Sequence, residues 1–429
     1  MMTDIKFLYD KYKQSGKVST DTRTITPGSV FFSLKGERFN ANEFAAQALQ
    51  NGASYAVVDE ERWVKGDAYI LVNDALEALQ QLARYHRDQL TIPIVALTGS
   101  NGKTTTKELL HAVLSQKYEV TATKGNLNNH IGVPLTILDI NRSTEVAVVE
   151  MGANHVGEIA TLCKIANPTH GLITNIGKAH IGTFGGFENI IRGKSEMYQH
   201  LIDHDGVVWI NSQNPILFNM AKRFQNPLLY PSKGDFYHCE MISADPYVKV
   251  KTEDEHELNT NLVGAYNFEN VALALCVGKF FEVDANKTVE AIANYKPTNM
   301  RSQVLEKGSN TILLDAYNAN PSSMKVAIDS LAKMKGKRKV AILGDMYELE
   351  GETEREHKKI VDLLINAKID EAFLCGALFL KSVEESSAIK VFSTKEKLSK
   401  YLESHKFNDS IILIKASRGM ALESVMDHI

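Results

Sequence analysis

The feature that most constrains the fold of this chain is the glycine-rich segment Thr98-Gly-Ser-Asn-Gly-Lys-Thr-Thr-Thr106. It follows an apolar run at residues 92–97 and precedes residues 107–114, whose apolar side chains recur at helical spacing. In this context a glycine loop binds phosphate, because its backbone N–H groups close around phosphate oxygens and the helix N-terminus adds partial positive charge. The alternative is a tight strand-to-helix turn that contains a lysine by chance. We predict a phosphate-binding loop whose ligand residues are Gly99, Ser100, Asn101, Gly102, Lys103, Thr104 and Thr105.

Two residues of this loop have distinct expected roles. The Lys103 ammonium neutralises the β- and γ-phosphates of a nucleotide, and the Thr104 hydroxyl reaches a Mg²⁺ ion. The general pattern of such loops has a glycine five residues before Gly102, where this chain has Leu97. The loop is therefore a G-x-x-G-K-T-T variant rather than the form of GTPases and motor proteins. This variant resembles the Mur ligase family, whose members use ATP to join an amine to a carboxylate.

Bulk composition limits the class of protein. A chain of 429 residues is too long for one core and predicts about two to four domains. The net charge of −4 disfavours a nucleic-acid-binding protein, which usually has a strongly basic face. We find no secretory signal at the N-terminus and no apolar run near the roughly 18 residues that span a bilayer. Without such a run we expect no membrane association. The four cysteines form no C-x-x-C pair, so we expect buried thiols and a cytoplasmic location.

Alternating strand-like and helix-like patterns divide the chain into three segments and predict an α/β protein. Residues 1–90 combine short β-like pieces with helix-like stretches and form a small α/β domain. Residues 91–298 alternate β-branched runs with helical patterns, which predicts a mostly parallel sheet of the P-loop ATPase type with helices on both faces. In residues 299–429 the alternation restarts, and we expect a Rossmann-like, doubly wound domain.

Polar side chains follow two further strands of the central segment. Glu150 ends the run 146–149, where open α/β sheets bind ligands, and its carboxylate is a hard oxygen ligand for Mg²⁺. His180 follows the strand-like run 171–176; alone, such a histidine is more often a loop or core residue. The family resemblance implies that His180 contacts a metal. It also implies that Lys194 is carbamylated by CO₂, which turns a cation into an anionic ligand for a second Mg²⁺.

Asparagines are concentrated in two places in the central segment. Residues 123–134 are rich in amides and glycine, and the resemblance implies that this loop contacts a muramoyl-peptide substrate through Asn126, Asn128 and Asn129. Asn267 and Asn270 are three residues apart, so they share one face of a helix. The resemblance implies that both lie near adenine. Many family members have histidine at the position of Tyr266.

The C-terminal segment carries the motif that narrows the resemblance. Residues 314–324 read Leu-Asp-Ala-Tyr-Asn-Ala-Asn-Pro-Ser-Ser-Met, which predicts a capped helix start at Pro321. The same residues resemble the signature of the family members that add D-alanyl-D-alanine. In that interpretation Asp315 lies near the ATP ribose, Asn318 near the nucleotide, and Arg301 reaches ATP. Two further blocks of this subgroup contain Asp345, Glu348, Lys415 and Arg418, and the D-N-P-R signature of the members that add the third amino acid is absent.

The N-terminal segment resembles the UDP-binding part of the family. Basic side chains suit a diphosphate, and an aromatic ring can stack on uracil. The candidate substrate-binding residues here are Thr22, Arg23, Lys35 and Arg38. The chain reads Asn40-Ala-Asn where the family often has Asp-Gly-His.

Together these resemblances imply a reaction and its partners. ATP phosphorylates the terminal carboxylate of UDP-N-acetylmuramoyl-tripeptide, and the amine of D-alanyl-D-alanine then attacks the acyl phosphate. Two Mg²⁺ ions take part, and the implied catalytic residues are Lys103, His180 and Lys194. A monomer suffices, and we expect the last segment to rotate about residues 297–300 during closure. Two alternatives remain. One is another amide-forming ligase of the superfamily, such as a folylpolyglutamate synthase or a Mur ligase of different amine specificity. The other is a nucleotide-dependent switch protein.

Overall fold

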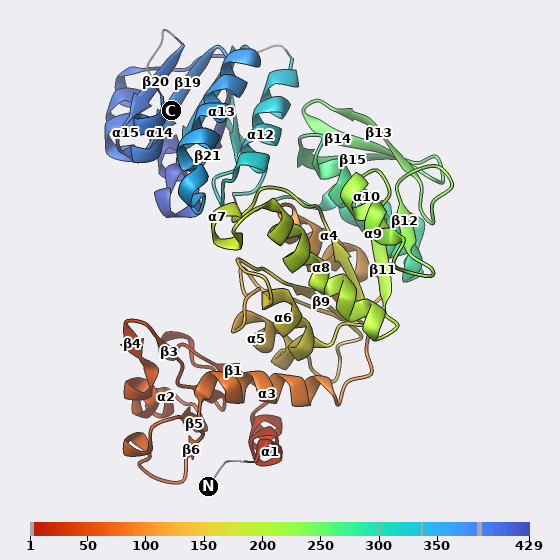
Figure 1. Ribbon diagram of the computed structural model, residues 1–429, viewed down its shortest axis with the longest axis vertical. Helices are drawn as coiled ribbons and strands as arrows, with labels where there is room; N and C mark the ends of the chain where they lie inside the picture. Colours follow the sequence, from red (N-terminus) through yellow and green to blue (C-terminus); the bar gives the residue numbers. More distant parts are fainter. Residues whose placement is uncertain (1–3, 299, 336–337, 384–387) are drawn as a thin grey trace.

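The computed structural model describes residues 4–298, 300–335, 338–383 and 388–429, and it contains three α/β parts arranged along the long axis of the molecule (Figure 1). We call them the N-terminal part, whose elements span Ile5–Arg87, the central part, whose elements span Ile94–Asn294, and the C-terminal part, which begins at Met300 and whose elements span Gln303–His428. Asn299, at which the predicted third segment begins, lies outside the described residues.

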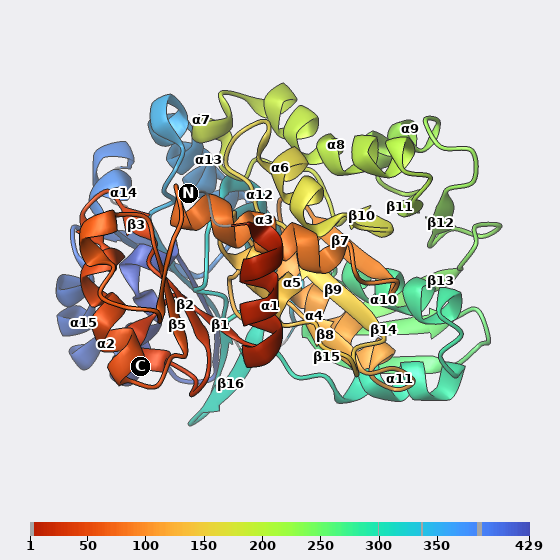
Figure 2. The same ribbon diagram turned by 90° about the horizontal axis from the view of Figure 1, so that it is seen from below.

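The N-terminal part is built on a parallel sheet of four strands in the order β1-β2-β5-β6. In that order the strands are Val18–Ser19, Val30–Phe32, Tyr55–Val58 and Tyr69–Leu71. This part also contains a hairpin of β3 (Lys35–Gly36) and β4 (Phe39–Asn40). Its helices are α1 (Ile5–Ser15), α2 (Ala45–Gln50) and α3 (Ala75–Arg87). Asp74 caps α3 by accepting the backbone N–H of Glu77. α3 packs against two helices of the central part, and Tyr12 of α1 donates to the carbonyl of Leu138; in Figure 2 both helices lie in front of that part. The buried Arg87 fixes this contact, because its guanidinium donates to the carbonyls of Ala166 and Asn167.

The central sheet has six parallel strands in the order β12-β11-β10-β7-β9-β8. In that order they are Leu228–Tyr230, Val207–Asn211, His170–Ile173, Ile94–Thr98, Val146–Glu150 and Val120–Ala122. Side chains alternate between the two faces of a strand, so β7 serves two cores. Val95 and Leu97 pack with the helices α4 (Lys103–Leu114) and α10 (Asn267–Phe280). Ile94 and Ala96 face the opposite core.

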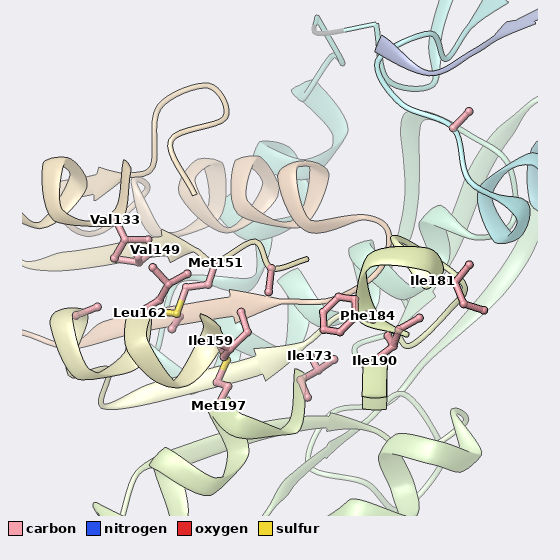
Figure 3. Close-up of a cluster of buried hydrophobic side chains, with 14 of the residues drawn as sticks. Val133, Val149, Met151, Ile159, Leu162, Ile173, Ile181, Phe184, Ile190 and Met197 are labelled. Carbon is pink, nitrogen blue, oxygen red and sulfur yellow. The ribbon is translucent and has the colours of Figure 1, made fainter. Parts of the chain in front are cut away.

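The opposite core lies under α5 (Gly132–Leu138), α6 (Glu158–Ala166) and α8 (Phe187–Asp203), as Figure 3 shows. The remaining helices of the central part are α7 (Ile181–Phe184), α9 (Pro215–Ala221) and α11 (Ala285–Asn294). A separate antiparallel sheet of β13 (Cys239–Ala244), β14 (Tyr247–Thr252) and β15 (Glu257–Val263) packs beside α10 and α11. The predicted parallel sheet with helices on both faces is confirmed, and the antiparallel sheet is an addition to it.

The C-terminal part has six strands in the order β16-β17-β21-β18-β19-β20, of which only β16 is antiparallel to its neighbour. In that order the strands are Gln303–Lys307, Asn310–Leu314, Ser410–Lys415, Arg338–Gly344, Glu371–Cys375 and Ile389–Phe392; the helices are α12 (Pro321–Lys333), α13 (Thr353–Asn366), α14 (Ala377–Ser382) and α15 (Lys395–Ser404). The predicted start of α12 at Pro321 is confirmed: Asn320 is its N-cap and forms a reciprocal capping box with Ser323.

Two predictions about the chain as a whole concern cysteines and membranes. All four cysteines are buried free thiols, as expected, and burial raises the pKa of Cys163, Cys239 and Cys375 to about 12. Among the described residues, no helix has the length and the apolar composition that crossing a membrane requires.

Candidate active site

Strand order explains why the candidate residues of the central part meet. β10, β7 and β9 are adjacent and parallel, so the loops that follow their C-terminal ends lie side by side. The loop after β7 is the glycine loop, β9 ends at Glu150, and the loop after β10 carries Asn175 and His180. β10 ends at Ile173, earlier than the strand-like run 171–176 indicated, and this leaves residues 174–180 free to contact the glycine loop.

The glycine loop adopts a conformation that its glycines make possible. Gly102 is the N-cap of α4 and has a φ of 79°, in the left-handed region. A Cβ at this position would lie 2.7 Å from Oδ1 of Asn270, so both the backbone angle and the space require glycine. The helix that follows therefore presents its first backbone N–H groups to the cavity.

The two residues predicted to serve phosphate and metal lie at the start of α4. The ammonium of Lys103 donates to the carbonyl of Gly99 at 2.7 Å, and burial lowers its pKa. The Thr104 hydroxyl donates to Oε2 of Glu150 at 3.0 Å. Glu150 is 1% exposed and also accepts the side-chain amide of Asn128 at 2.8 Å. Hydroxyl and carboxylate oxygens are the hard ligands that Mg²⁺ prefers, so this donor pair fits the ion.

Within the described ranges of the chain, no three His, Cys, Asp or Glu side chains gather closely enough to form a metal site by themselves. A metal ion bound here would therefore complete its shell with oxygens from phosphate or water, as Mg²⁺ commonly does at nucleotides.

The loop after β10 holds the glycine loop from the other side. Asn175 accepts the backbone N–H of Asn101 at 3.0 Å, and the Thr174 hydroxyl donates to the Asn101 carbonyl at 2.6 Å. The Ser100 hydroxyl bonds the backbone of Gly177 at 2.8 Å. These contacts fix the glycine loop before any ligand arrives.

His180 lies at the end of this loop, at the boundary with the C-terminal part. It has a φ of 55° and precedes α7. Its ring contacts the carboxylate of Glu348 of the C-terminal part, and the hydrogen bond from His180 lowers the pKa of Glu348. His180 lines the same cavity as the glycine loop and Glu150.

Lys194, on α8, occupies a different position from the other metal candidates. Its side chain is 1% exposed, and its ammonium nitrogen lies 5.6 Å from the ring centre of Phe184. It makes no hydrogen bond or ion pair with any residue that the structure describes, and it does not line the cavity wall. Burial lowers its pKa well below the usual lysine value, and the nearby Lys103 lowers it further.

The candidate adenine residues lie on one face of α10, as their spacing predicted. Asn270 donates to Asn267 at 2.9 Å and accepts the Thr106 hydroxyl at 3.1 Å. The Tyr266 hydroxyl lies 2.5 Å from the hydroxyl of Ser302 and therefore links the central part to the C-terminal part. The position where this chain departs from many family members thus bridges two parts of the molecule.

The C-terminal part closes the cavity with charged and aromatic groups. The Arg301 guanidinium lies 3.8 Å from the ring centre of Tyr317. Asp315 pairs with the buried Lys415 at 2.5 Å, and Lys415 also donates to the carbonyl of Asn318 at 2.9 Å. The buried Asp345 has a structural role, because it accepts the backbone N–H groups of Leu378 and Phe379 at the start of α14.

One cavity of about 1070 Å³ gathers most of the predicted site residues. Those that line it are Ser100, Asn101, Gly102, Lys103, Thr104, Thr105, Asn126, Asn128, Asn129, Glu150, His180, Asn267, Asn270, Arg301, Asp315 and Asn318. Asn320 also lines it and donates to Oδ1 of Asn101 at 2.8 Å. Asn320 was not among the predicted site residues, although it belongs to the motif at residues 314–324. Its place between a strand end and a capped helix is the signal from which it could have been found.

The remaining candidates lie elsewhere. Gly99 and Lys194 do not line the cavity, and neither do Thr22, Arg23, Lys35 and Arg38 of the N-terminal part. Arg23 is exposed and paired with Asp21 at 2.6 Å, while the Lys35 ammonium lies 2.8 Å from Asp59 and 3.1 Å from Glu60. Arg23 and Lys35 therefore lie outside that cavity, each paired with carboxylates of the N-terminal part.

Comparison with known proteins gives a consistent result. Residues 97–278 match the Mur ligase middle domain, and residues 300–418 match the family described as Mur ligase, glutamate ligase domain. The UDP-N-acetylmuramoyl-tripeptide–D-alanyl-D-alanine ligase of Bacillus subtilis is 36% identical over 422 residues, which cover 95% of this chain and 92% of that protein.

Two solved structures have the same overall fold. MurF from Acinetobacter baumannii has a TM-score of 0.86 and 31% identity, covering 96% of this chain and 92% of that one. MurF from Thermotoga maritima in complex with ADP has a TM-score of 0.84 and 29% identity, covering 100% and 98%. The predicted resemblance and α/β fold class are therefore confirmed: this chain belongs to the Mur ligase family.

Proposed function

We propose that this chain is an ATP-dependent ligase that joins D-alanyl-D-alanine to the terminal carboxylate of UDP-N-acetylmuramoyl-tripeptide in peptidoglycan precursor synthesis. The observation that carries the proposal is the shared cavity. The glycine loop, the Thr104–Glu150 pair and the C-terminal Arg301 and Asp315 all line one space of about 1070 Å³. The name of the B. subtilis relative and the ADP in the T. maritima structure support the substrate and the nucleotide.

The three parts of the chain divide the substrates between them in this proposal. Residues 1–90 bind the UDP-sugar, residues 91–298 bind ATP, and residues 299–429 complete the nucleotide site. Thr22, Arg23, Lys35 and Arg38 contact the sugar nucleotide. Because Arg23 and Lys35 are paired with carboxylates, a diphosphate must compete with Asp21, Asp59 and Glu60 for them.

Electrostatics explains the residue types in the cavity. Phosphorylation of a carboxylate brings two anions together, and each pair of unit charges about 4 Å apart costs about 4 kcal/mol at an effective dielectric near 20. Lys103 neutralises part of the γ-phosphate charge at the start of α4. Thr104 and Glu150 would hold one Mg²⁺ ion, and His180 with carbamylated Lys194 would hold a second. Bound there, the ions supply positive charge between the phosphate and the incoming carboxylate.

The bonds change in two steps. A carboxylate oxygen of the tripeptide attacks the γ-phosphorus, and ADP leaves. The amine of D-alanyl-D-alanine then attacks the acyl carbon, phosphate leaves, and the amine loses its proton. Asn126, Asn128 and Asn129 line the same cavity as Glu150, to which Asn128 donates, and would orient the peptide end. The chain needs no covalent nucleophile for either step.

Carbamylation of Lys194 follows from the chemistry of a buried amine. A neutral amine attacks CO₂, forms an N–C bond and releases a proton, which leaves an anionic carbamate. Burial lowers the pKa of Lys194 and so favours the neutral, reactive form. The carbamate also lengthens a side chain that does not itself line the cavity.

The decisive experiment measures phosphate release from ATP with the purified protein. We expect release only when UDP-N-acetylmuramoyl-tripeptide and D-alanyl-D-alanine are both present. Release with a different amine or with a folate substrate would instead support another ligase of the superfamily. Release that needs neither substrate would support a nucleotide switch. We also expect the enzyme to act as a monomer in the cytoplasm, where ATP is supplied.

A further inference from the structure

The loop after β10 contacts the C-terminal part as well as the glycine loop. The backbone N–H of Lys178 donates to the Ser322 hydroxyl at 2.8 Å, and that of Gly182 donates to the carbonyl of Glu348 at 3.2 Å. A Cβ at Gly177 would lie 2.9 Å from Oγ of Ser322, so the two parts touch at this point. One short segment, residues 175–182, therefore connects the glycine loop to α12 and to the loop that precedes α13.

An ion pair crosses the same boundary outside the cavity. The Lys178 ammonium lies 3.0 Å from Oε1 of Glu356 on α13. The Glu356 side chain is 3% exposed and that of Lys178 is 36% exposed. Lys359, also on α13, donates to the same oxygen at 2.9 Å. Burial opposes the ionisation of Glu356, but the hydrogen bonds from Lys359 and Lys178 outweigh it and lower its pKa.

We propose that Lys178 and Glu356 are positioning residues that latch the C-terminal part onto the glycine loop and so hold the nucleotide cavity closed. The proposal deepens the ligase function proposed above and rests on it for the identity of the reaction. Removing one of the cations that contact a buried carboxylate costs free energy, so the Lys178–Glu356 pair favours the closed arrangement. Closure matters because Arg301 and Asp315 reach the cavity only from the C-terminal part.

The effect of the latch extends to the glycine loop through Gly177, the residue before Lys178. Gly177 and the Ser100 hydroxyl exchange hydrogen bonds of 2.8 Å, and Asn101 receives the amide of Asn320 from the C-terminal part. If the latch opens, these contacts lose their common support. Neither Lys178 nor Glu356 lines the cavity, so substitutions in the pair leave the groups that touch the substrates in place.

Two matched variants separate a latch from a general charge effect. Lys178→Met and Lys359→Met each remove one positive charge that lies about 3 Å from the same carboxylate oxygen. Only Lys178 comes from the central part. For Lys178→Met we expect a rise in the KM for ATP and a fall in kcat/KM on the order of 10-fold, in the range measured for close charge pairs across interfaces. For Lys359→Met we expect kinetics within about twofold of the wild type.

A double-mutant cycle with Glu356→Gln tests whether the two residues act together. We expect the combined Lys178→Met and Glu356→Gln losses in kcat/KM to be smaller than the product of the single losses. Equal kinetic effects of Lys178→Met and Lys359→Met would overturn the proposed latch. A kcat/KM loss in the double variant equal to the product of the Lys178→Met and Glu356→Gln losses would overturn it as well.

Small-angle scattering supplies a readout that does not depend on activity. We expect the nucleotide-free Lys178→Met protein to have a larger radius of gyration than the wild type, and Lys359→Met to match the wild type. An unchanged radius for Lys178→Met would also reject the latch. Failure of the proposed function looks different: the wild type itself would then release no phosphate with the two substrates, whatever the scattering shows.

Discussion

Lys194 shows how burial changes the chemistry of a single amine. Its side chain is 1% exposed and forms no hydrogen bond or ion pair among the residues described. An unpaired ammonium is costly in such surroundings, so the neutral amine is favoured, and this form reacts with CO₂. The carbamate would then supply the negative charge that the proposed second metal site needs.

We predict that Lys194→Ala lowers kcat by at least about 100-fold, as loss of a metal-site group commonly does. Added short-chain carboxylic acids should restore part of the activity, because they place a carboxylate in the vacated space. Phosphate release measures both effects. Lys164→Ala, which changes an exposed lysine on the neighbouring helix α6, is the control. Full activity of Lys194→Ala would contradict the carbamate.

Glu269 is a second residue whose environment sets its charge. It lines the nucleotide cavity, and burial raises its pKa from 4.5 to about 6. The folded protein therefore binds this proton more tightly than the unfolded chain does. The contribution of protonated Glu269 to the free energy of unfolding is therefore fully present below pH 4.5 and is lost as the pH rises through about 6.

We predict that the unfolding free energy of the wild type falls by about 2 kcal/mol relative to that of Glu269→Gln between pH 4 and pH 7, because each pKa unit corresponds to about 1.4 kcal/mol. Denaturant unfolding at several pH values measures the difference. Glu290→Gln, at an exposed position of α11, should follow the wild-type curve. Parallel pH profiles for the wild type and Glu269→Gln would show that Glu269 is not protonated in this range.

The start of α5 depends on a single glycine. A Cβ at Gly132 would overlap the backbone of Leu127, in the loop that carries the candidate substrate residues. Asn128 of this loop donates to Glu150 at 2.8 Å, so a shift of the loop disturbs the carboxylate proposed to bind Mg²⁺.

We predict that Gly132→Ala destabilises the protein by about 1–3 kcal/mol, the usual cost of overpacking, and lowers kcat/KM for the UDP-linked substrate. Thermal unfolding and phosphate release test the two effects. Gly351→Ala is the matched control, because a Cβ there meets no atom within 4 Å and its backbone is not left-handed. Wild-type kinetics in Gly132→Ala would mean that the loop does not position the substrate.

At the level of elements, the sequence predicted the parts whose pattern is local. The fully buried strands β7 and β9 read as continuous apolar runs, and the glycine loop has a fixed spacing to α4. The antiparallel sheet β13–β15 was not predicted. The strand β14 mixes buried valines with the exposed Lys249 and the half-buried Lys251, and its register with β15 is irregular, so its pairing depends on neighbours that no local pattern specifies.

At the level of the whole molecule, the contacts between parts were beyond prediction. Asn101 and Asn320 are 219 positions apart, and Lys178 and Glu356 are 178 positions apart. Each residue alone resembles a solvated polar side chain or a cap. The family resemblance supplied candidates for the cavity wall, but the pairing of Lys35 with Asp59 and the burial of Lys194 away from that wall follow only from the three-dimensional fold.

A ligand that touches two parts of a chain couples their stability. The nucleotide cavity is lined by the glycine loop of the central part and by residues 315–323 of the C-terminal part, whereas β2 and β5 of the N-terminal part do not line it. At a concentration about 100 times its Kd, a ligand stabilises the form that binds it by about 2.7 kcal/mol. Hydrogen exchange of backbone amides reports this stabilisation segment by segment.

We predict that ADP with Mg²⁺ slows exchange in residues 99–105 and 315–323 at the same nucleotide concentration and leaves β2 and β5 unchanged. Arg301→Ala removes a cavity-lining cation of the C-terminal part that stacks on Tyr317. In this variant, protection of residues 315–323 should weaken while residues 99–105 stay protected, because the proposed phosphate contacts of the glycine loop are unchanged. Protection confined to residues 99–105 in the wild type would mean that the nucleotide binds the central part alone and that the C-terminal part closes for another reason.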